Sequence, residues 1–308
     1  MTTSPTLCPV GPGDVHTAAR TIAGQIRRTP LLDVTIGGRP VLLKLEHLQR
    51  GGSFKLRGAL NALLRCPRPD QVITASGGNH GLGVATAAAM LGLPATVFVP
   101  ETVPPAKARR IEATGARLIR HGTSYAQAAA AAMAAATSPD SRYLSAYDDP
   151  DVIAGQGTVA LEVLADAPDV DTIAVAVGGG GLAAGTALVA DGRTTVAVEP
   201  EHCRSVHDAL AAGRPVDSPI DSVAASALGT NRAGAIPFEI LNSPTTVSVL
   251  VSDAEILAAV DLLWEEFRLA VEPAGAAGFA AWYAGRIPGA RACVVLCGAN
   301  TEWSHANG

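Results

Sequence analysis

Short apolar runs rich in β-branched residues alternate with alanine-rich stretches along most of this chain. Apolar runs at residues 72–75, 95–99, 117–119 and 142–144 predict four buried strands. Alanine-rich segments at 81–91, 106–114 and 125–136 lie between them and predict helices. This alternation is typical of a parallel sheet with helices on its faces, because each crossover between parallel strands needs about a dozen residues or more.

A second series of the same kind follows. Apolar runs at 172–177, 195–198, 246–250 and 293–296 predict four further strands with helices between them. One helix is expected to have Asp253 as its N-cap and to extend to about Phe267. We therefore predict an α/β fold of two lobes, each an open, mostly parallel, twisted sheet covered by helices. Residues 1–69 and 148–308 form the predicted large domain, and residues 70–147 form a small inserted α/β domain.

Composition narrows the class of protein. The chain has 308 residues, of which 48% are hydrophobic and 17% charged, with a formal net charge of −5 and no basic run interleaved with aromatic residues. This argues against a nucleic-acid partner. The alanine-rich stretch 126–136 is too short to span a bilayer, and we find no secretory signal, so we expect a cytoplasmic protein without a membrane partner. The five cysteines are widely spaced without a CxxC pair, which argues against a disulfide framework or a zinc site.

Lys55 stands in an unusual setting for a lysine. It follows a Gly-Gly-Ser turn at residues 51–53 and has the aromatic ring of Phe54 beside it. An apolar surrounding penalises the charged form of an amine, and glycines let a ligand approach closely. A surface lysine at a helix start has the same local sequence and is the more common case. The rest of the chain must therefore decide whether Lys55 is reactive.

Two glycine-rich turns follow predicted strands. The turn at residues 76–81, Ser-Gly-Gly-Asn-His-Gly, offers backbone N–H groups with hydroxyl, amide and imidazole donors, which suits a carboxylate or phosphate. A sharp strand-to-helix turn would also need its glycines. Four consecutive glycines after the run 172–177 form what we call the tetraglycine loop, which indicates close approach of the backbone to a ligand, best matched by a phosphate. They are Gly178, Gly179, Gly180 and Gly181.

The tetraglycine loop allows a second interpretation. Gly178-x-Gly180 followed by Ala183 approximates a dinucleotide-binding fingerprint, and Glu199 ends the next strand about 20 residues further on, where a ribose-binding acid belongs. An NAD(P)-dependent enzyme is therefore the alternative from another class. It leaves Lys55 unexplained, and four glycines in a row are not the fingerprint itself.

Cys297 follows the last apolar run, at the carboxyl end of a predicted strand. A polar atom there could face a ring nitrogen of a cofactor, whereas a small buried cysteine near a tight turn is the more common local explanation. Together, a reactive lysine, a phosphate cup, a carboxylate cup and a neutral hydrogen-bond partner are the parts that a pyridoxal phosphate enzyme acting on amino acids requires.

The ordered motifs of nearly the whole chain resemble the serine/threonine dehydratases (ammonia-lyases), which are fold type II, tryptophan-synthase-β-like pyridoxal phosphate enzymes. The resemblance implies a cofactor in the cleft between the lobes, a homodimer, and β-elimination of L-serine or L-threonine to a 2-oxo acid and ammonia. The motifs that carry it are Arg28-Thr29-Pro30-Leu31, Gly52-Ser53-Phe54-Lys55, Ser76-x-Gly78-Asn79-His80, residues 148–158, the tetraglycine loop, Val198-Glu199-Pro200, residues 272–276 and residues 297–300.

The same resemblance assigns a role to each candidate residue. Lys55 is implied to form the Schiff base and to act as the catalytic base. The residues implied to bind the cofactor are Phe54 at the ring, Asn79 at its phenolic oxygen, Gly178, Gly179, Gly180 and Gly181 at the phosphate, and Cys297 at the pyridine nitrogen. Those implied to surround the substrate carboxylate, an interaction of the small domain, are Ser76, Gly77, Asn79 and His80.

Two departures from related serine racemases qualify this assignment. Those enzymes have a serine at the position of Gly77 as a second acid/base, and glycine cannot supply a proton, which favours elimination over racemisation. They also bind a divalent cation with a glutamate at the position of Glu199 and an aspartate where this chain has Ser205. We therefore assign no metal site and keep Glu199 as a candidate ligand. A 3-hydroxyaspartate dehydratase, an amino-acid racemase and a non-catalytic homologue stay open as alternatives.

Overall fold

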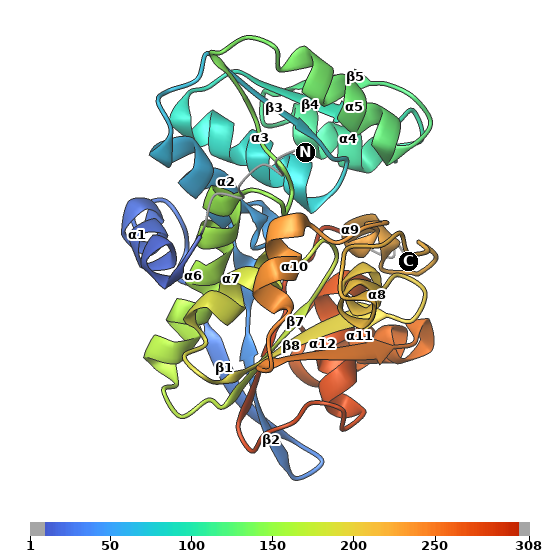
Figure 1. Cartoon of the computed structure of the whole chain (residues 1–308). Coiled ribbons are helices and arrows are strands. Elements are labelled where there is room, and N and C mark those ends of the chain that lie inside the picture. Colours follow the sequence, from blue (N-terminus) through green and yellow to red (C-terminus); the bar gives the residue numbers. More distant parts are fainter. Residues whose placement is uncertain (1–9, 302–308) are drawn as a thin grey trace.

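Two separate sheets organise the chain in the computed structural model, which describes residues 10–301 (Figure 1). The larger sheet has the strand order β1-β2-β10-β7-β8-β9 and the smaller one β5-β4-β3-β6. The larger sheet contains β1 (Leu31–Ile36), β2 (Arg39–Lys44), β7 (Thr172–Ala176), β8 (Thr194–Pro200), β9 (Thr246–Val251) and β10 (Ala292–Val295). The smaller sheet contains β3 (Gln71–Ala75), β4 (Ala95–Val99), β5 (Arg117–Arg120) and β6 (Ser141–Tyr143).

All neighbouring strands pair in parallel except β1 and β2. The predicted two-lobed α/β fold with mostly parallel sheets is confirmed. The β1–β2 hairpin was not among the predicted elements. Its sequence signal is Gly37-Gly38, whose φ angles of 58° and 77° are the left-handed values that a two-residue hairpin turn requires.

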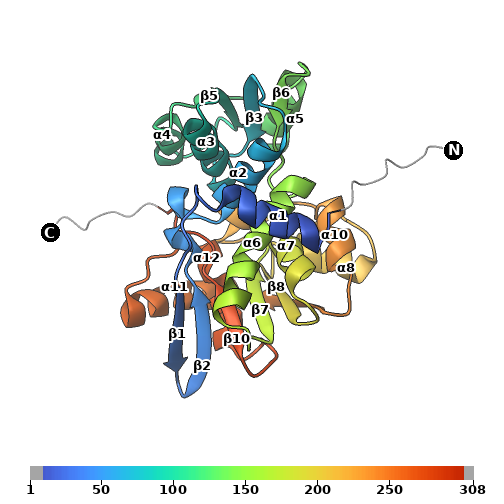
Figure 2. The same ribbon diagram turned by 90° about the vertical axis from the view of Figure 1, so that its left-hand side faces the viewer.

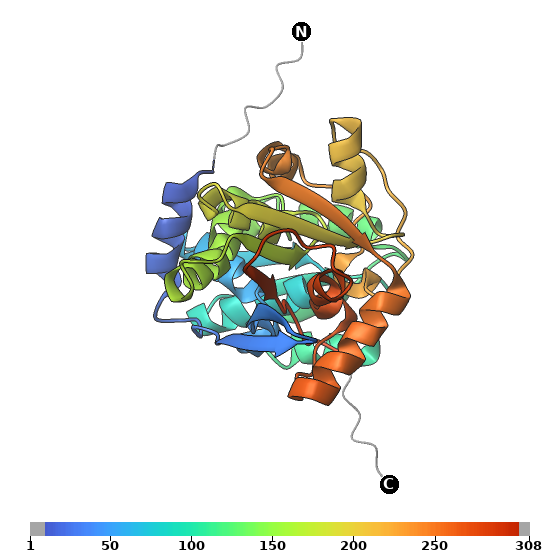
Figure 3. The ribbon, with the colours of Figure 1, turned by 90° about the horizontal axis from the view of Figure 1, so that it is seen from below.

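Helices cover both sheets. Helices α1, α6 and α7 lie on one face of the larger sheet, and α11 and α12 lie on the other (Figures 2 and 3). No helix in the described part of the chain is long and apolar enough to cross a membrane. The helices are α1 (Pro12–Ile22), α2 (Lys55–Arg65), α3 (Asn79–Leu91), α4 (Pro105–Glu112), α5 (Tyr125–Ala135), α6 (Pro150–Asp166), α7 (Gly181–Val189), α8 (Ser205–Ala212), α9 (Ala225–Leu228), α10 (Ala235–Leu241), α11 (Asp253–Phe267) and α12 (Pro273–Tyr283).

The start of α11 corrects one expectation. The N-cap is Ser252 and not Asp253, because Ser252 and Glu255 form a reciprocal capping box. The Ser252 hydroxyl accepts from the N–H of Glu255, and the Glu255 carboxylate accepts from the N–H of Ser252 at 2.8 Å. Asp253 is the first helical residue, and its carboxylate accepts from the Ser222 hydroxyl at 2.6 Å instead.

The hydrophobic core falls into two main clusters that share helix α2 as a neighbour. One cluster surrounds the larger sheet, with buried residues of α6, α7 and α12. The other joins Leu56 and Leu60 of α2 to Val84 of α3 and Val97 of β4. All strands of the smaller sheet lie between residues 71 and 143, but its core continues into α2. The domain boundaries at 69/70 and 147/148 therefore stay a prediction.

Candidate active site

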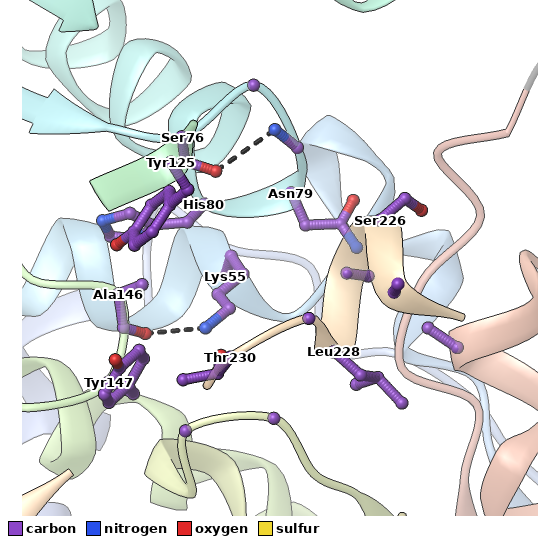
Figure 4. Close-up of a pocket in the computed structure, with 18 of the residues that line it drawn as sticks. Lys55, Ser76, Asn79, His80, Tyr125, Ala146, Tyr147, Ser226, Leu228 and Thr230 are labelled. Carbon is purple, nitrogen blue, oxygen red and sulfur yellow. Dashed lines mark hydrogen bonds between the residues drawn. The ribbon is translucent and has the colours of Figure 1, made fainter. Parts of the chain in front are cut away.

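A cavity of about 380 Å³ lies between the two lobes, where strand ends from both sheets meet. Its wall contains the predicted site residues at the starts of α2 and α3, in the β7–α7 loop and at the end of β10. Of the predicted site residues, only Glu199 does not line this cavity. Figure 4 shows four of them around this space. The residues in the wall are Phe54, Lys55, Ser76, Gly77, Asn79, His80, Gly178, Gly179, Gly180, Gly181 and Cys297.

Lys55 is the first residue of α2 and points into the cavity (Figure 4). Its Nζ donates to the carbonyl oxygen of Ala146 at 2.6 Å and lies 5.0 Å from the centroid of the Phe54 ring. Burial lowers the pKa of Lys55 to about 8, because the charged form loses its water, and the nearby Cys297 acts weakly in the opposite direction. A sizeable share of this amine is therefore neutral and nucleophilic at mildly alkaline pH.

Two buried acids, Glu46 and Glu162, are already paired with other basic side chains. Arg57 binds Glu46 at 2.6 Å and Glu162 at 2.8 Å, and Lys44 binds Glu162 at 2.6 Å. These four side chains are buried and their charges balance. The network links Arg57 of α2 to Lys44 of β2 and Glu162 of α6, and also to Glu46 in the short turn after β2. It leaves Lys55 without a carboxylate partner, which is consistent with the lowered pKa of its amine.

The tetraglycine loop turns its carbonyl groups away from the cavity. Their partners are the Ser205 hydroxyl for Gly178 at 3.2 Å, the Gly234 N–H for Gly179 at 3.0 Å and the Ala184 N–H for Gly180 at 2.8 Å. The N–H groups of Gly178, Gly179 and Gly180 have no acceptor among residues 10–301. A loop whose acceptors are satisfied and whose donors are unpaired is suited to an anion.

Two positions of the loop strongly favour glycine. A Cβ on Gly179 would lie 2.3 Å from the ring of Tyr147, so the ring and the backbone are in close contact. Gly180 has φ of +100° and caps the N-terminus of α7. The loop therefore presents bare backbone at the positive end of a helix, as a phosphate cup requires.

The turn at residues 76–81 is the start of α3. Ser76 Oγ accepts from the N–H of Gly78 at 3.1 Å (Figure 4), and the N–H groups of the first helical turn have no partner within the helix. His80 donates from Nε2 to the carbonyl of Leu144 at 3.1 Å, while burial and the nearby Lys55 lower its pKa to about 3. A neutral imidazole has one N–H, so a carboxylate here would be bound by the backbone and Ser76 and not by the His80 ring.

Gly77 faces the loop between β4 and α4. A Cβ on Gly77 would lie 2.6 Å from Cγ2 of Val103, which is itself buried. A serine at this position would thus have to displace a stiff β-branched side chain. The missing hydroxyl at Gly77 has a packing reason in this chain as well as a chemical consequence.

Asn79 and Cys297 line the cavity on other sides. The amide of Asn79 donates from Nδ2 to a carboxylate oxygen of Glu272 and accepts at Oδ1 from Asn300. Cys297 is 3% exposed, and its Sγ donates to the carbonyl of Ala274 at 3.6 Å. Burial raises the pKa of the Cys297 thiol to about 12, so it offers a neutral partner at physiological pH.

Glu199 is fully buried away from the cavity, under helix α8. Its carboxylate accepts from the backbone N–H groups of Val206 at 2.9 Å and His207 at 2.7 Å. Burial raises the pKa of Glu199 to about 8, and these two N–H groups act in the opposite direction. The helix start uses both carboxylate oxygens, and no group of three or more His, Cys, Asp or Glu side chains in the described chain could hold a metal ion. Glu199 as a metal ligand therefore stays a prediction.

The sequence reasoning did not single out several groups of the wall, among them the segment from Pro100 to Lys107 after β4. Ala146 and Tyr147 precede the acidic turn, where Asp149 caps α6 and Asp148 accepts from two N–H groups at the start of α10. Tyr125, the first residue of α5, also lines the cavity (Figure 4). Residues 225–230 line it as well. Only the acidic turn carried a signal, since it was one of the motifs of the resemblance.

Comparisons with known proteins agree on a family. The family model described as pyridoxal-phosphate dependent enzyme matches residues 22–298. The chain is 40% identical to the L-threonine ammonia-lyase of Geobacter sulfurreducens over 277 residues, which are 86% of this chain and 68% of that protein. The threonine deaminase of T.th. superposes with a TM-score of 0.88 at 36% identity, covering 95% of this chain and 99% of that one. Maize serine racemase also gives a TM-score of 0.88, at 26% identity, covering 95% and 94%.

These findings decide between the two cofactor classes. The NAD(P) alternative is wrong, because the family is defined by another cofactor and because the acid meant for a ribose, Glu199, is buried and bound to a helix start. The unpaired amides of the tetraglycine loop fit the phosphate of pyridoxal phosphate, which the family uses. The chain belongs to the family of pyridoxal-phosphate dependent enzymes, as a fold type II member related to the threonine ammonia-lyases.

Proposed function

We propose that this protein is a pyridoxal phosphate-dependent ammonia-lyase that converts L-threonine and L-serine to a 2-oxo acid and ammonia. The observation that carries the proposal is the pairing of Lys55, a buried amine whose pKa is lowered to about 8, with the unpaired N–H groups of the tetraglycine loop across one cavity. The relatives named threonine ammonia-lyase and threonine deaminase support the same substrate class.

Each part of the cavity suits one part of the cofactor. Lys55 would hold it covalently through Nζ, and the tetraglycine loop would bind its phosphate. Phe54 would lie against the ring, Asn79 would donate to the phenolic oxygen, and the neutral thiol of Cys297 would face the ring nitrogen. When bound, pyridoxal phosphate supplies an electron sink for the charge left at the substrate α-carbon.

The protein's own groups would then handle the proton and the carboxylate. The neutral Nζ of Lys55 takes the α-proton, and the Ala146 carbonyl holds one of its N–H bonds so that the lone pair keeps a defined direction. The backbone N–H groups at the start of α3, with the hydroxyl of Ser76, bind the substrate carboxylate. Tyr125 and Tyr147 line the cavity and would limit the access of water.

Gly77 supports elimination over racemisation. It supplies no second acid or base, and Val103 occupies the space that a side chain at this position would need. Two alternatives within the family, a 3-hydroxyaspartate dehydratase and an amino-acid racemase, use the same cavity and differ from the proposal in substrate and in product. A non-catalytic homologue would bind the cofactor and release no keto acid.

Two further properties belong to the proposal. We expect a homodimer, which the resemblance to the dehydratases supports. We also expect a cytoplasmic location, which fits the absence of disulfides among Cys66, Cys203, Cys293 and Cys297 within the described residues. Cys8 lies outside the described residues. Sedimentation of the purified holoenzyme would test the dimer.

The deciding experiment is a keto-acid assay on the cofactor-loaded protein with L-threonine, L-serine, 3-hydroxyaspartate and the D-isomers. We expect keto acid from the first two substrates and none from Lys55→Ala, which should also lose the visible absorbance of the bound cofactor. Chiral analysis of the remaining substrate would reveal racemisation. A wild-type protein that carries the cofactor and releases no keto acid from L-threonine or L-serine would overturn the proposal.

A further inference from the structure

Asn79 is held between two side chains from the distant C-terminal part of the chain. Its Nδ2 donates to Oε1 of Glu272, and its Oδ1 accepts from Nδ2 of Asn300. Asn79 is 7% exposed and Glu272 is 4% exposed, so water cannot replace either partner freely. Buried polar groups are stable only when they are hydrogen-bonded, and this pair of bonds therefore constrains the Asn79 amide.

The orientation of Asn300 is itself fixed by the backbone. Its Nδ2 donates to the carbonyl of Gly51 at 2.9 Å as well as to Asn79. The Gly51 carbonyl can only accept, so the amino end of the Asn300 amide faces it, and the same amino group faces Asn79. A Cβ on Gly52 would lie 2.6 Å from Oδ1 of Asn300, so this glycine leaves the room that the arrangement requires. Asn300 therefore presents a donor to Asn79.

Glu272 presents an acceptor from the other side. It is the N-cap residue of α12, and a Cβ on Gly298 would lie 2.2 Å from its Oε1, so only a glycine leaves room for the carboxylate. Burial raises the pKa of Glu272, while the N–H of Asn79 and the charges of Lys107 and Arg110 act in the opposite direction. In its ionised form a carboxylate accepts hydrogen bonds and donates none.

We propose that Glu272 and Asn300 are positioning residues that fix the amide of Asn79 with its NH2 group as a donor toward the cavity. One N–H of that group is bound to Glu272, and the other has no acceptor in the described part of the chain. The inference rests on the proposed function, which places Asn79 at the phenolic oxygen of the cofactor. If the amide were reversed, Oδ1 of Asn79 would face the phenolic oxygen of the cofactor, and the two oxygens would repel each other.

The sharpest test exchanges the carboxylate at position 272 with the amide at position 300. In the double variant E272Q/N300D the carboxylate moves from position 272 to position 300, so the charge of the network is unchanged. The Asn79 amide can then turn over, donating to the new carboxylate at position 300 and accepting from the new amide at position 272. Arg110, whose Nη1 lies 3.5 Å from Oδ1 of Asn300, is placed to neutralise that carboxylate. The bonds to the Asn79 amide are kept, and the group that faces the cavity changes from donor to acceptor.

Asn300→Asp alone is the control for the hydrogen bond that the Gly51 carbonyl loses in the exchange.

Two readouts besides activity report the effect: the Kd of the apoprotein for pyridoxal phosphate, and the pH dependence of the visible absorbance of the loaded protein. We expect the double variant to bind the cofactor at least about tenfold more weakly, equal to about 1.4 kcal/mol, and to have a shifted absorbance. Affinity and spectrum like those of the wild type, in a folded double variant, would overturn the inference, because a purely structural network would be restored by the exchange.

Glu272→Gln alone keeps the test decisive if the double variant does not fold. It removes the acceptor-only group that selects the amide orientation, and we expect a weaker change of the same two readouts, with wild-type values contradicting the inference. Asp171→Asn is the control for the loss of a hydrogen-bonded carboxylate, since Asp171 accepts two backbone N–H groups and lies outside the cavity wall. A failed keto-acid assay on the wild type would reject the proposed reaction while leaving the spectroscopic result on Asn79 intact.

Discussion

The tetraglycine loop of the larger lobe and the turn at residues 76–81 of the smaller lobe both follow a parallel strand and open onto the same cavity. They differ in what faces the ligand. The tetraglycine loop is bare backbone packed against Tyr147, and its carbonyl groups accept hydrogen bonds from Ser205, Gly234 and Ala184. The second combines helix-start N–H groups with the side chains of Ser76 and Asn79, each held by a specific partner.

Because of this difference, we expect the two regions to be sensitive to different kinds of substitution. At the tetraglycine loop, added volume should be the harmful change, because there is no side chain whose polarity could be altered. At the small-lobe turn, orientation and polarity should matter more, because the donors depend on neighbours such as Glu272 and Asn300. Substitutions at Gly179 and at Gly77 test the two sides of this comparison.

Gly179→Ala should have the largest effect. Its Cβ would lie 2.3 Å from the ring of Tyr147, so either the ring or the loop must move. Overpacking costs about 1–3 kcal/mol, and we expect the affinity of the apoprotein for pyridoxal phosphate to fall about 10- to 100-fold. Titration of the apoprotein with the cofactor measures this. Gly24→Ala is the matched control, since nothing lies within 4 Å of its added Cβ. Wild-type affinity in Gly179→Ala would remove the tetraglycine loop as the phosphate site.

Gly77→Ser should lower the elimination rate about tenfold, because its Cβ would lie 2.6 Å from Cγ2 of Val103. The double variant Gly77→Ser/Val103→Ala should recover much of that rate and convert part of the L-serine to the D-isomer. The measurement is a keto-acid assay with chiral analysis of the remaining serine, and Val103→Ala alone is the control for lost packing. A single Gly77→Ser variant with full activity and rapid racemisation would show that Val103 does not restrict this position.

The rate at which the apoprotein incorporates pyridoxal phosphate should follow the neutral fraction of Lys55. Because burial lowers the pKa of Lys55 to about 8, the amine is protonated below that pH and its lone pair is not available. We expect the rate to rise about tenfold per pH unit up to about pH 8 and then to level off. Stopped-flow absorbance measures it, with Lys55→Arg as the control that incorporates nothing. A rate that still climbs steeply at pH 10 would show an ordinary lysine.

The sequence predicts the repeating parts of the molecule well. Helices α3, α4 and α5 agree closely with the predicted segments at 81–91, 106–114 and 125–136, because alanine-rich stretches between β-branched runs have a strong local preference. Ser252 was missed as the cap of α11, although the spacing to Glu255 is a recognisable capping box. Local patterns are readable when the bonds that decide them lie within a few residues.

Contacts between distant segments are not readable in the same way. The bond between Asn79 and Glu272 joins the start of α3 to the start of α12, and it exists only because Gly298 leaves space between them. The Ala146 carbonyl that binds Lys55 belongs to a segment without any chemical signature of its own. Such partners follow from which strand ends the fold places side by side, and a hydrophobic pattern carries no information on that.

The smallest expected effect concerns divalent cations. Glu199 binds the N–H groups of Val206 and His207, so the positive end of α8 occupies the place that a cation would take, and Ser205 donates to Gly178. We expect treatment with EDTA, or addition of magnesium or manganese, to change the elimination rate less than about twofold. Ser205→Asp is the informative variant, because it adds a carboxylate beside Glu199 and breaks the bond to Gly178. A cation that raises the melting temperature of Ser205→Asp and leaves that of the wild type unchanged would fit this account. A wild-type enzyme inactivated by EDTA and restored by magnesium would contradict it, and the tetraglycine loop would then depend on a metal and not only on its own backbone.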